Sequence, residues 1–193
     1  MLAVFDMGGV IIRDFDAIKA VEDFLGKPLS ALSPSARALF VLHCEGKLSE
    51  EEVWAGISRE TPGFEPPAEP FFGRFCHSEL DQGAVSLVKT LRERGIRTVC
   101  ATNVIPSHYE YHVRNGHYSF FDKVYASCEM GVTKPGLRFF RLLLEEERAK
   151  AGDVFFTDDS WRNVEAALSL GFHACLYRDA AKLREDLARE GLA

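Results

Sequence analysis

The stretch LAVFDMGGVI, residues 2–11, decides how this chain folds. Four apolar residues lead into Asp6, and the pair Gly8-Gly9 follows almost at once. A short apolar run of this kind is typical of a buried strand of a parallel sheet. Asp6 then falls at the carboxyl end of the strand, where open α/β sheets bind their ligands. Because glycine has no side chain, we expect the N–H groups of Gly8 and Gly9 to approach an anion closely. Taken alone, the stretch fits an aspartate before a simple glycine turn equally well.

Further along, from Asp81 onward, helical patterns alternate with short apolar runs. Helices are expected at 85–91, 107–114, 137–147, 164–170 and from 179 onward. Strands are expected at 96–101, 123–126, 154–156 and 173–177. This alternation predicts βαβ units, so the fold class is α/β, with a Rossmann-like parallel sheet and helices on both faces.

Residues 14–81 interrupt this pattern directly after the first strand. A helical stripe covers 15–25, Ser33-Pro34 opens a second helix, and Ser49 with Glu52 forms the capping box of a third. No convincing strand appears in this segment. We therefore predict an α/β core of residues 1–13 and 82–193, split by an all-helical cap domain of residues 14–81. An insertion at this point would lie as a lid over the carboxyl end of the sheet.

Composition narrows the classes of protein. The chain has 193 residues, 47% of them hydrophobic, and a net charge of −6, which argues against a nucleic-acid partner. No apolar run approaches the roughly 20 residues that span a bilayer, so no membrane association is expected. The five cysteines are scattered and odd in number. With no signal-peptide pattern at the start, they suggest reduced thiols in a cytoplasmic protein.

Polar residues recur where later strands and loops end. Thr102-Asn103 follows the strand at 96–101, and Lys134 lies in a loop before a helix. Each has an ordinary interpretation, as a turn and as a surface charge. Asp158-Asp159, after the apolar run at 154–156, is less ordinary because adjacent carboxylates repel each other unless a cation lies beside them. Clustered oxygen ligands suit Mg²⁺. Asn163 is expected to open the next helix and to tether this loop.

The ordered set of these motifs resembles the haloacid dehalogenase superfamily of aspartate-nucleophile phosphohydrolases, and the resemblance covers nearly the whole chain. The segments that carry it are FDMGGV at 5–10, ATN at 101–103, Lys134-Pro135, and FTDD at 156–159 with Asn163. Each segment is weak alone, but the ordered set with the insertion in place is specific. The insertion is similar to the family's helical cap between its first and second motifs.

The resemblance implies that Asp6 is a nucleophile that forms an aspartyl-phosphate, which water then hydrolyses. It also implies a Mg²⁺ cofactor held by Asp6, the carbonyl of Gly8 and Asp159, with Asp158 acting through water.

The phosphoryl group of the substrate has its own set of expected ligands. By the same resemblance, Thr102, Asn103, Lys134 and the N–H groups of Met7 and Gly8 would bind its oxygens. Thr102 and Lys134 then assist catalysis together with Asp6, and Lys134 offsets the repulsion between Asp6 and the phosphate.

Gly8 departs from the usual family pattern. Phosphatases of this superfamily usually carry an aspartate there as general acid and base, a contribution typically worth ~10²–10⁴-fold. Variants with glycine resemble a branch that includes bacterial sugar-phosphate phosphatases. Asp14, Asp16 or a cap residue such as His43 are candidates to replace the missing group.

The sequence is therefore compatible with three functions. The first is a Mg²⁺-dependent phosphatase for a small phosphorylated metabolite, with sugar phosphates as one class. The second is a 2-haloacid dehalogenase, which needs no metal and against which Asp158-Asp159 argues. The third is a phosphometabolite-binding domain whose catalysis is weakened by Gly8.

Overall fold

A computed structural model describes residues 1–13, 17–76 and 78–192. Its centre is a five-stranded sheet of order β5-β4-β1-β6-β7 in which every neighbouring pair is parallel. The strands are β1 (Leu2–Phe5), β4 (Arg97–Thr102), β5 (Lys123–Ala126), β6 (Val154–Asp158) and β7 (His173–Leu176). The predicted α/β class with a parallel sheet is confirmed.

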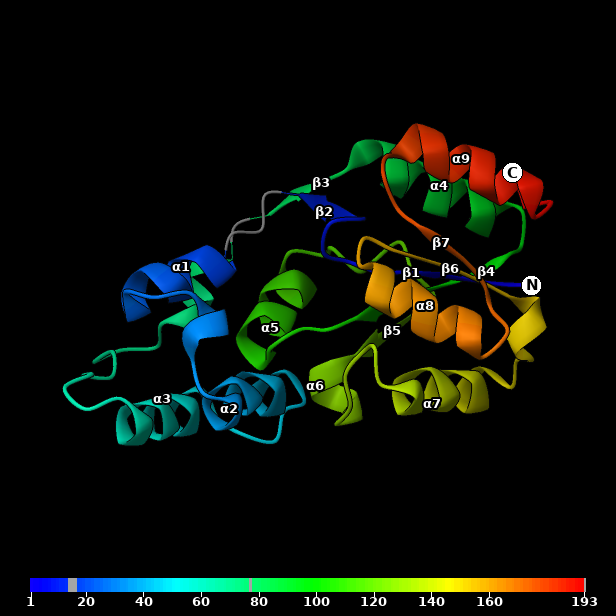
Figure 1. Ribbon diagram of the computed structural model, residues 1–193. Helices are drawn as coiled ribbons and strands as arrows, with labels where there is room; N and C mark the ends of the chain where they lie inside the picture. The colour runs from blue at the N-terminus through cyan, green and yellow to red at the C-terminus, as the bar shows by residue number, and fades with distance from the viewer. Residues whose placement is uncertain (14–16, 77, 193) are drawn as a thin grey trace.

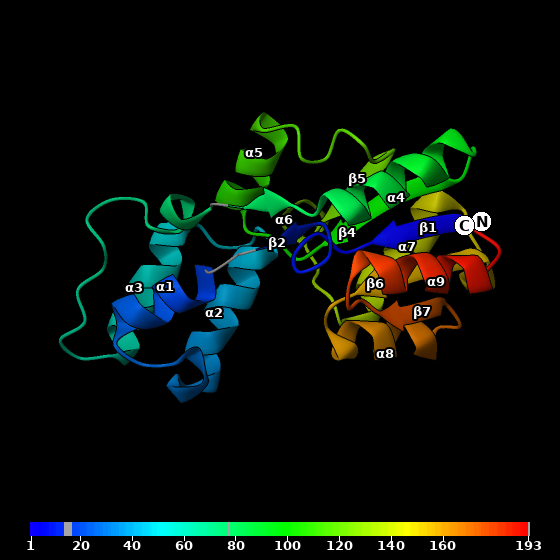
Figure 2. The same ribbon diagram turned by 90° about the horizontal axis from the view of Figure 1, so that it is seen from above.

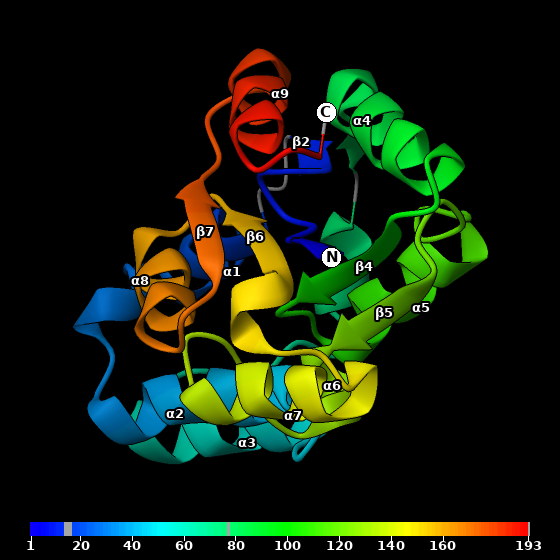
Figure 3. The ribbon, with the colours of Figure 1, turned by 90° about the vertical axis from the view of Figure 1, so that its right-hand side faces the viewer.

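Helices cover both faces of this sheet (Figures 1 and 3). Those of the core are α4 (Gln82–Glu93), α5 (Pro106–Arg114), α6 (Ser127–Met130), α7 (Leu137–Glu147), α8 (Trp161–Ser169) and α9 (Ala180–Arg189), with a 3₁₀ turn η3 (Ala151–Asp153). Along β1, Ala3 and Phe5 pack into the hydrophobic cluster that holds α4 and α9. Leu2 and Val4 pack into the other cluster, with α7 and α8. Because successive side chains of a strand point to opposite faces, an all-apolar β1 is what two covered faces require.

Between the first strand and α4 lies a segment, residues 17–76, whose regular elements are all helices or 3₁₀ turns, here termed the helical segment. It contains α1 (Ala17–Leu25), η1 (Leu29–Ala31), α2 (Pro34–Cys44), α3 (Glu50–Glu60) and η2 (Phe72–Phe75). These pack around a third hydrophobic cluster in which Trp54 stacks on Phe72 with ring centroids 5.1 Å apart. Both predicted helix starts are confirmed, since Ser33 Oγ accepts from Ala36 N and Ser49 with Glu52 forms a complete capping box.

The expectation that residues 14–81 contain no strand is wrong. Strand β3 (Glu79–Leu80) lies inside 14–81 and pairs antiparallel with β2 (Ile12–Arg13). Two-residue strands are too short to show an alternating pattern in the sequence. They form because the chain leaves the core and returns to it side by side, so that the two backbones satisfy each other's hydrogen-bonding groups.

Helices α1, α2 and α3 lie together beyond one end of the strands (Figures 1 and 2), and α6 contacts α2. Ser127 at the start of α6 is fully buried, and its hydroxyl donates to the Cys44 carbonyl over 2.6 Å. Gly46 lies against the carbonyl of Cys128, where a Cβ would approach within 2.3 Å. The two parts are therefore in close backbone contact at this point. Among the described residues, none of the helices is long and apolar enough to cross a bilayer.

Candidate active site

Three neighbouring strands bring the predicted site residues to one edge of the sheet. Asp6 follows β1, Thr102 ends β4, and Asp158 ends β6. In the register of the sheet, Phe5 pairs with both Cys100 and Thr157, so these strand ends lie level with one another. The carboxyl ends of parallel strands meet at one edge, which is why residues far apart in the sequence form a single site.

Lys134 lies between two carboxylates. Its Nζ donates to Asp6 Oδ1 over 2.8 Å and to Asp158 Oδ2 over 2.6 Å, and its side chain is only 1% exposed. Burial alone would lower the pKa of Lys134, but the two anions outweigh burial and raise the pKa above its usual value. The interpretation of Lys134 as a surface charge is therefore excluded, and the two carboxylates favour its charged form.

Asp158 is fully buried and held from several sides. Ser160 N donates to Oδ1 over 2.8 Å, and Asn163 Nδ2 lies 3.0 Å from both carboxylate oxygens. Asn163 tethers this loop as expected, although it does not open the helix: α8 begins at Trp161, so Asn163 lies in its first turn. With its oxygens already accepting from protein donors, Asp158 is suited to organising the site.

Asn103 holds the loop that carries Lys134. Its Nδ2 donates to the Lys134 carbonyl over 2.8 Å, and its Oδ1 accepts from Lys134 N over 2.9 Å. This two-point contact fixes the backbone from which the Lys134 side chain projects. Binding of phosphate by Asn103 remains a prediction, while the positioning of Lys134 is what its hydrogen bonds show.

The three carboxylates form a cluster that is open to a cation. Oxygens of Asp6, Asp158 and Asp159 all lie within 4.8 Å of one another. Burial, together with the nearby Asp158, raises the pKa of Asp6 to about 7 and also raises the pKa of Asp159. Raised carboxylate pKa values mean that the anionic forms are under-compensated by the protein. Hard oxygen ligands with excess negative charge fit Mg²⁺.

The two glycines Gly8 and Gly9, which follow Asp6 closely, have different roles. Gly9 N donates to the Ile12 carbonyl over 2.9 Å, so the expectation that it would bind an anion is wrong. Instead, Gly9 has a φ of 71° and makes room for Asp159, whose Oδ2 lies 2.2 Å from where a Cβ would be. Gly8 is not among the positive-φ glycines, and a Cβ there would meet nothing within 4 Å.

A cavity of about 350 Å³ lies between the helical segment and the core, and Asn103 and Lys134 form part of its wall. His43 also lines it, whereas Asp14 and Asp16 lie outside the described residues. His43 Nδ1 contacts the Leu48 carbonyl at 2.7 Å, and its buried Nε2 has no hydrogen-bond partner. The sequence marked His43 only as one candidate, because no local pattern shows which helix face meets the core.

The sequence of this chain is similar to those of known proteins. Residues 1–171 match the model of the haloacid dehalogenase-like hydrolases. The chain belongs to this family. It is 28% identical over 181 residues to a sesquiterpene phosphatase of Aspergillus oryzae, covering 88% of this chain and 85% of that protein. It is 26% identical over 200 residues to the D-ribitol-5-phosphate phosphatase of Bacteroides thetaiotaomicron, covering 95% of each. It also matches a drimenol cyclase of Aspergillus calidoustus at 26% identity, where 74% of this chain spans 28% of that protein.

Solved structures of this hydrolase family have the same fold. A predicted family hydrolase from Porphyromonas gingivalis superposes with a TM-score of 0.75 at 25% identity, covering 100% of this chain and 98% of that one. A family enzyme from Bacteroides thetaiotaomicron, solved with magnesium and inorganic phosphate, superposes with a TM-score of 0.69 at 20% identity over 92% and 94% of the two chains.

Proposed function

We propose that this hydrolase is a Mg²⁺-dependent phosphatase that cleaves a small phosphorylated metabolite through an aspartyl-phosphate on Asp6. The observation that carries the proposal is the position of Lys134, a buried cation bonded at once to Asp6 and Asp158. A buried lysine between two carboxylates neutralises part of their charge. It also offers a donor to a third anion that arrives at the nucleophile.

In the proposed reaction, one set of residues carries the chemical step and another binds the phosphoryl group. A carboxylate oxygen of Asp6 attacks phosphorus while the bond to the leaving oxygen breaks, and water then displaces Asp6 and releases inorganic phosphate. Lys134, Thr102 and the N–H groups of Met7 and Gly8 would bind the phosphoryl oxygens, whose charge is greatest in the transition state. Asn103 keeps Lys134 in place through its two backbone hydrogen bonds.

The residues present fit Mg²⁺. Asp6, Asp159 and the Gly8 carbonyl would hold it, and Asp158, whose oxygens accept from Ser160 and Asn163, would act through water. When bound, the ion supplies positive charge against the phosphoryl oxygens. Both a sesquiterpene phosphatase and a ribitol-phosphate phosphatase are relatives, which supports the reaction but not one substrate.

The test is turnover of p-nitrophenyl phosphate by pure wild-type and Asp6→Asn protein, with Mg²⁺ and with EDTA. We expect activity only for the wild type in Mg²⁺, because an amide cannot attack phosphorus and the volume of the side chain is conserved. Unchanged turnover in Asp6→Asn would falsify the nucleophile. Full activity in EDTA, or release of chloride from 2-chloropropionate in EDTA, would favour the dehalogenase instead.

A further inference from the structure

The wall of the cavity beside Lys134 is mostly hydrocarbon. Of the fourteen described residues that line it, eight are aliphatic or aromatic. They come from both sides of the cavity, for example Val21 and Val41 from the helical segment and Ile105 from the core. Its volume of about 350 Å³ is within the range of small-molecule sites, which is about 300–1,000 Å³.

Most polar side chains of this wall are already used by the protein. Asn103 bonds to the backbone of Lys134, His108 Nε2 bonds to the Phe72 carbonyl, and Thr133 Oγ1 bonds to Glu45. The exception is His43 Nε2. It is the one lining group among the buried side-chain polar atoms that lack a partner in the described part of the chain. A ligand rich in hydroxyl groups would therefore leave most of them without partners, at a cost in free energy for each.

The mouth of the cavity carries exposed apolar side chains as well. Ile18 is 62% exposed and Val41 is 48% exposed, and both line the cavity. Large apolar side chains are normally buried in a soluble protein when a core position is available. Two of them beside an apolar cavity add to the surface that an apolar ligand can cover.

From these observations we infer that the substrate is the phosphate monoester of an apolar alcohol, whose hydrocarbon part fills this cavity while its phosphate lies at Asp6 and Lys134. This inference rests on the proposed phosphatase activity and narrows its substrate class. Sugar phosphates are one substrate class that the sequence suggests, but their hydroxyl groups would gain little binding free energy from contact with such an apolar wall.

The test is kcat/KM with Mg²⁺ for ethyl, butyl, hexyl and octyl phosphate, with glucose 6-phosphate for comparison. These leaving groups are all primary alcohols, so hydrocarbon burial is the main variable. We expect a rise of up to about fourfold for each methylene that enters the cavity, and glucose 6-phosphate at or below the level of ethyl phosphate. No dependence on chain length, or a preference for the sugar phosphate, would overturn the inference.

Matched variants locate the effect. Val41→Asn should lower the octyl-to-ethyl ratio of kcat/KM by about tenfold, since it removes apolar surface at the mouth. Val113→Asn is the control, because Val113 is 53% exposed on α5 and does not line the cavity. An equal effect of the two variants would count against the cavity.

Binding separates this inference from the proposed activity. Calorimetry with octylphosphonate and methylphosphonate, which are not hydrolysed, should give tighter binding of the octyl compound. If no ester is cleaved but octylphosphonate still binds more tightly than methylphosphonate, the proposed phosphatase activity is wrong and the inferred apolar site is supported. If p-nitrophenyl phosphate is cleaved but the two phosphonates bind equally, the apolar site is wrong and the phosphatase stands.

Discussion

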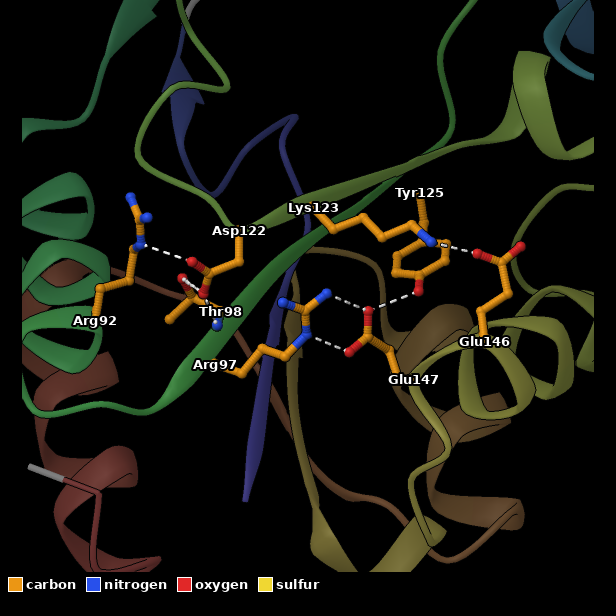
Figure 4. Close-up of polar contacts among 8 residues, drawn as sticks. All are labelled: Arg92, Arg97, Thr98, Asp122, Lys123, Tyr125, Glu146 and Glu147. Carbon is orange, nitrogen blue, oxygen red and sulfur yellow. Dashed lines mark hydrogen bonds and ion pairs between the residues drawn. The ribbon is translucent and has the colours of Figure 1, made fainter.

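Among the described residues, two ends of the same sheet each gather three carboxylates, but the charges of these carboxylates are balanced differently at each end. At the start of β4 and β5, the acids Asp122, Glu146 and Glu147 pair with the bases Arg92, Lys123 and Arg97 respectively (Figure 4). At the carboxyl end, Asp6, Asp158 and Asp159 face one lysine, Lys134. The first end can be stable by itself, whereas the second has negative charge left over for a cation.

The pKa shifts follow this difference. Burial would raise the pKa of Glu147, but hydrogen bonds from Arg97 and Tyr125 hold it below its usual value. Burial has the same direction at Asp6, and there Lys134 does not cancel it, so the pKa of Asp6 is raised to about 7. Glu147 is therefore stabilised as an anion, whereas the anionic form of Asp6 is destabilised. A site that must bind a cation and an anion needs the second arrangement.

The largest expected difference between the two ends of the sheet is the effect of removing a basic side chain on activity and stability. Lys134→Met should lower kcat/KM by about 10²–10³-fold, since it removes a donor to the phosphoryl group. It should also lower the free energy of unfolding by about 3–5 kcal/mol, because two buried carboxylates lose their partner.

The matched variant at the other end is Arg97→Met. Arg97 is 47% exposed, so its loss should cost about 1 kcal/mol or less and leave kcat/KM unchanged. Urea unfolding and steady-state kinetics of both proteins check this pair. Equal losses of stability would show that the two ends do not differ as described.

A second difference appears when a carboxylate is added. Without an acid at Gly8, the rate should depend strongly on the pKa of the leaving group, and aryl phosphates should be cleaved faster than alkyl phosphates. Gly8→Asp should speed the poor substrates by up to ~10²-fold and narrow that gap. The structure has room for this change, since a Cβ at Gly8 would meet nothing within 4 Å.

Gly152→Asp is the control for that substitution. Gly152 lies in η3 before β6, and a Cβ there also meets nothing within 4 Å. It should leave the leaving-group dependence unchanged. The measurement is kcat/KM across aryl and alkyl phosphates. A flat dependence in the wild type would mean that another group already supplies the proton, and His43→Phe would then be the next variant to measure.

A smaller effect is expected on stability when an acid is removed. In EDTA, Asp159→Asn should be at least as stable as wild type, because it relieves repulsion with Asp158. Mg²⁺ at 100 times its Kd should stabilise the wild type by about 2.7 kcal/mol, and the variant should lose most of this gain. Glu147→Gln should instead destabilise the protein with or without Mg²⁺. Thermal unfolding in both buffers measures all three. A loss of stability of Asp159→Asn in EDTA would contradict the excess of charge.

The sequence predicts the part of this molecule that depends on local pattern. Apolar runs set β1 and β6, and the capping residues Ser33 and Ser49 set two helix starts. The proximity of the site residues Asp6 and Asp158 can be predicted from the sequence, because the carboxyl ends of parallel strands lie at the same edge of a sheet. Lys134 needed the family resemblance, since a lone lysine in a loop has no local sign of burial.

What the sequence does not reveal depends on contacts across long separations. The hydrogen bonds of Asn103 to the Lys134 backbone, and the donation of Gly9 N to Ile12, depend on loop conformations. The pairing of Arg97 with Glu147 joins residues 50 positions apart. The apolar cavity exists because α1 and α2 face the loop after β4, an orientation that no periodicity encodes.

The central claim, that the carboxyl end of the sheet is a phosphatase site with Asp6 as nucleophile, is tested most directly by trapping the intermediate. The protein is mixed with p-nitrophenyl phosphate and Mg²⁺, quenched in acid, digested, and examined by mass spectrometry. We expect one phosphoryl group on the peptide that contains Asp6, and none in EDTA or in Asp6→Asn. A phosphoryl group on a different residue, or the same modification in Asp6→Asn, would contradict the claim.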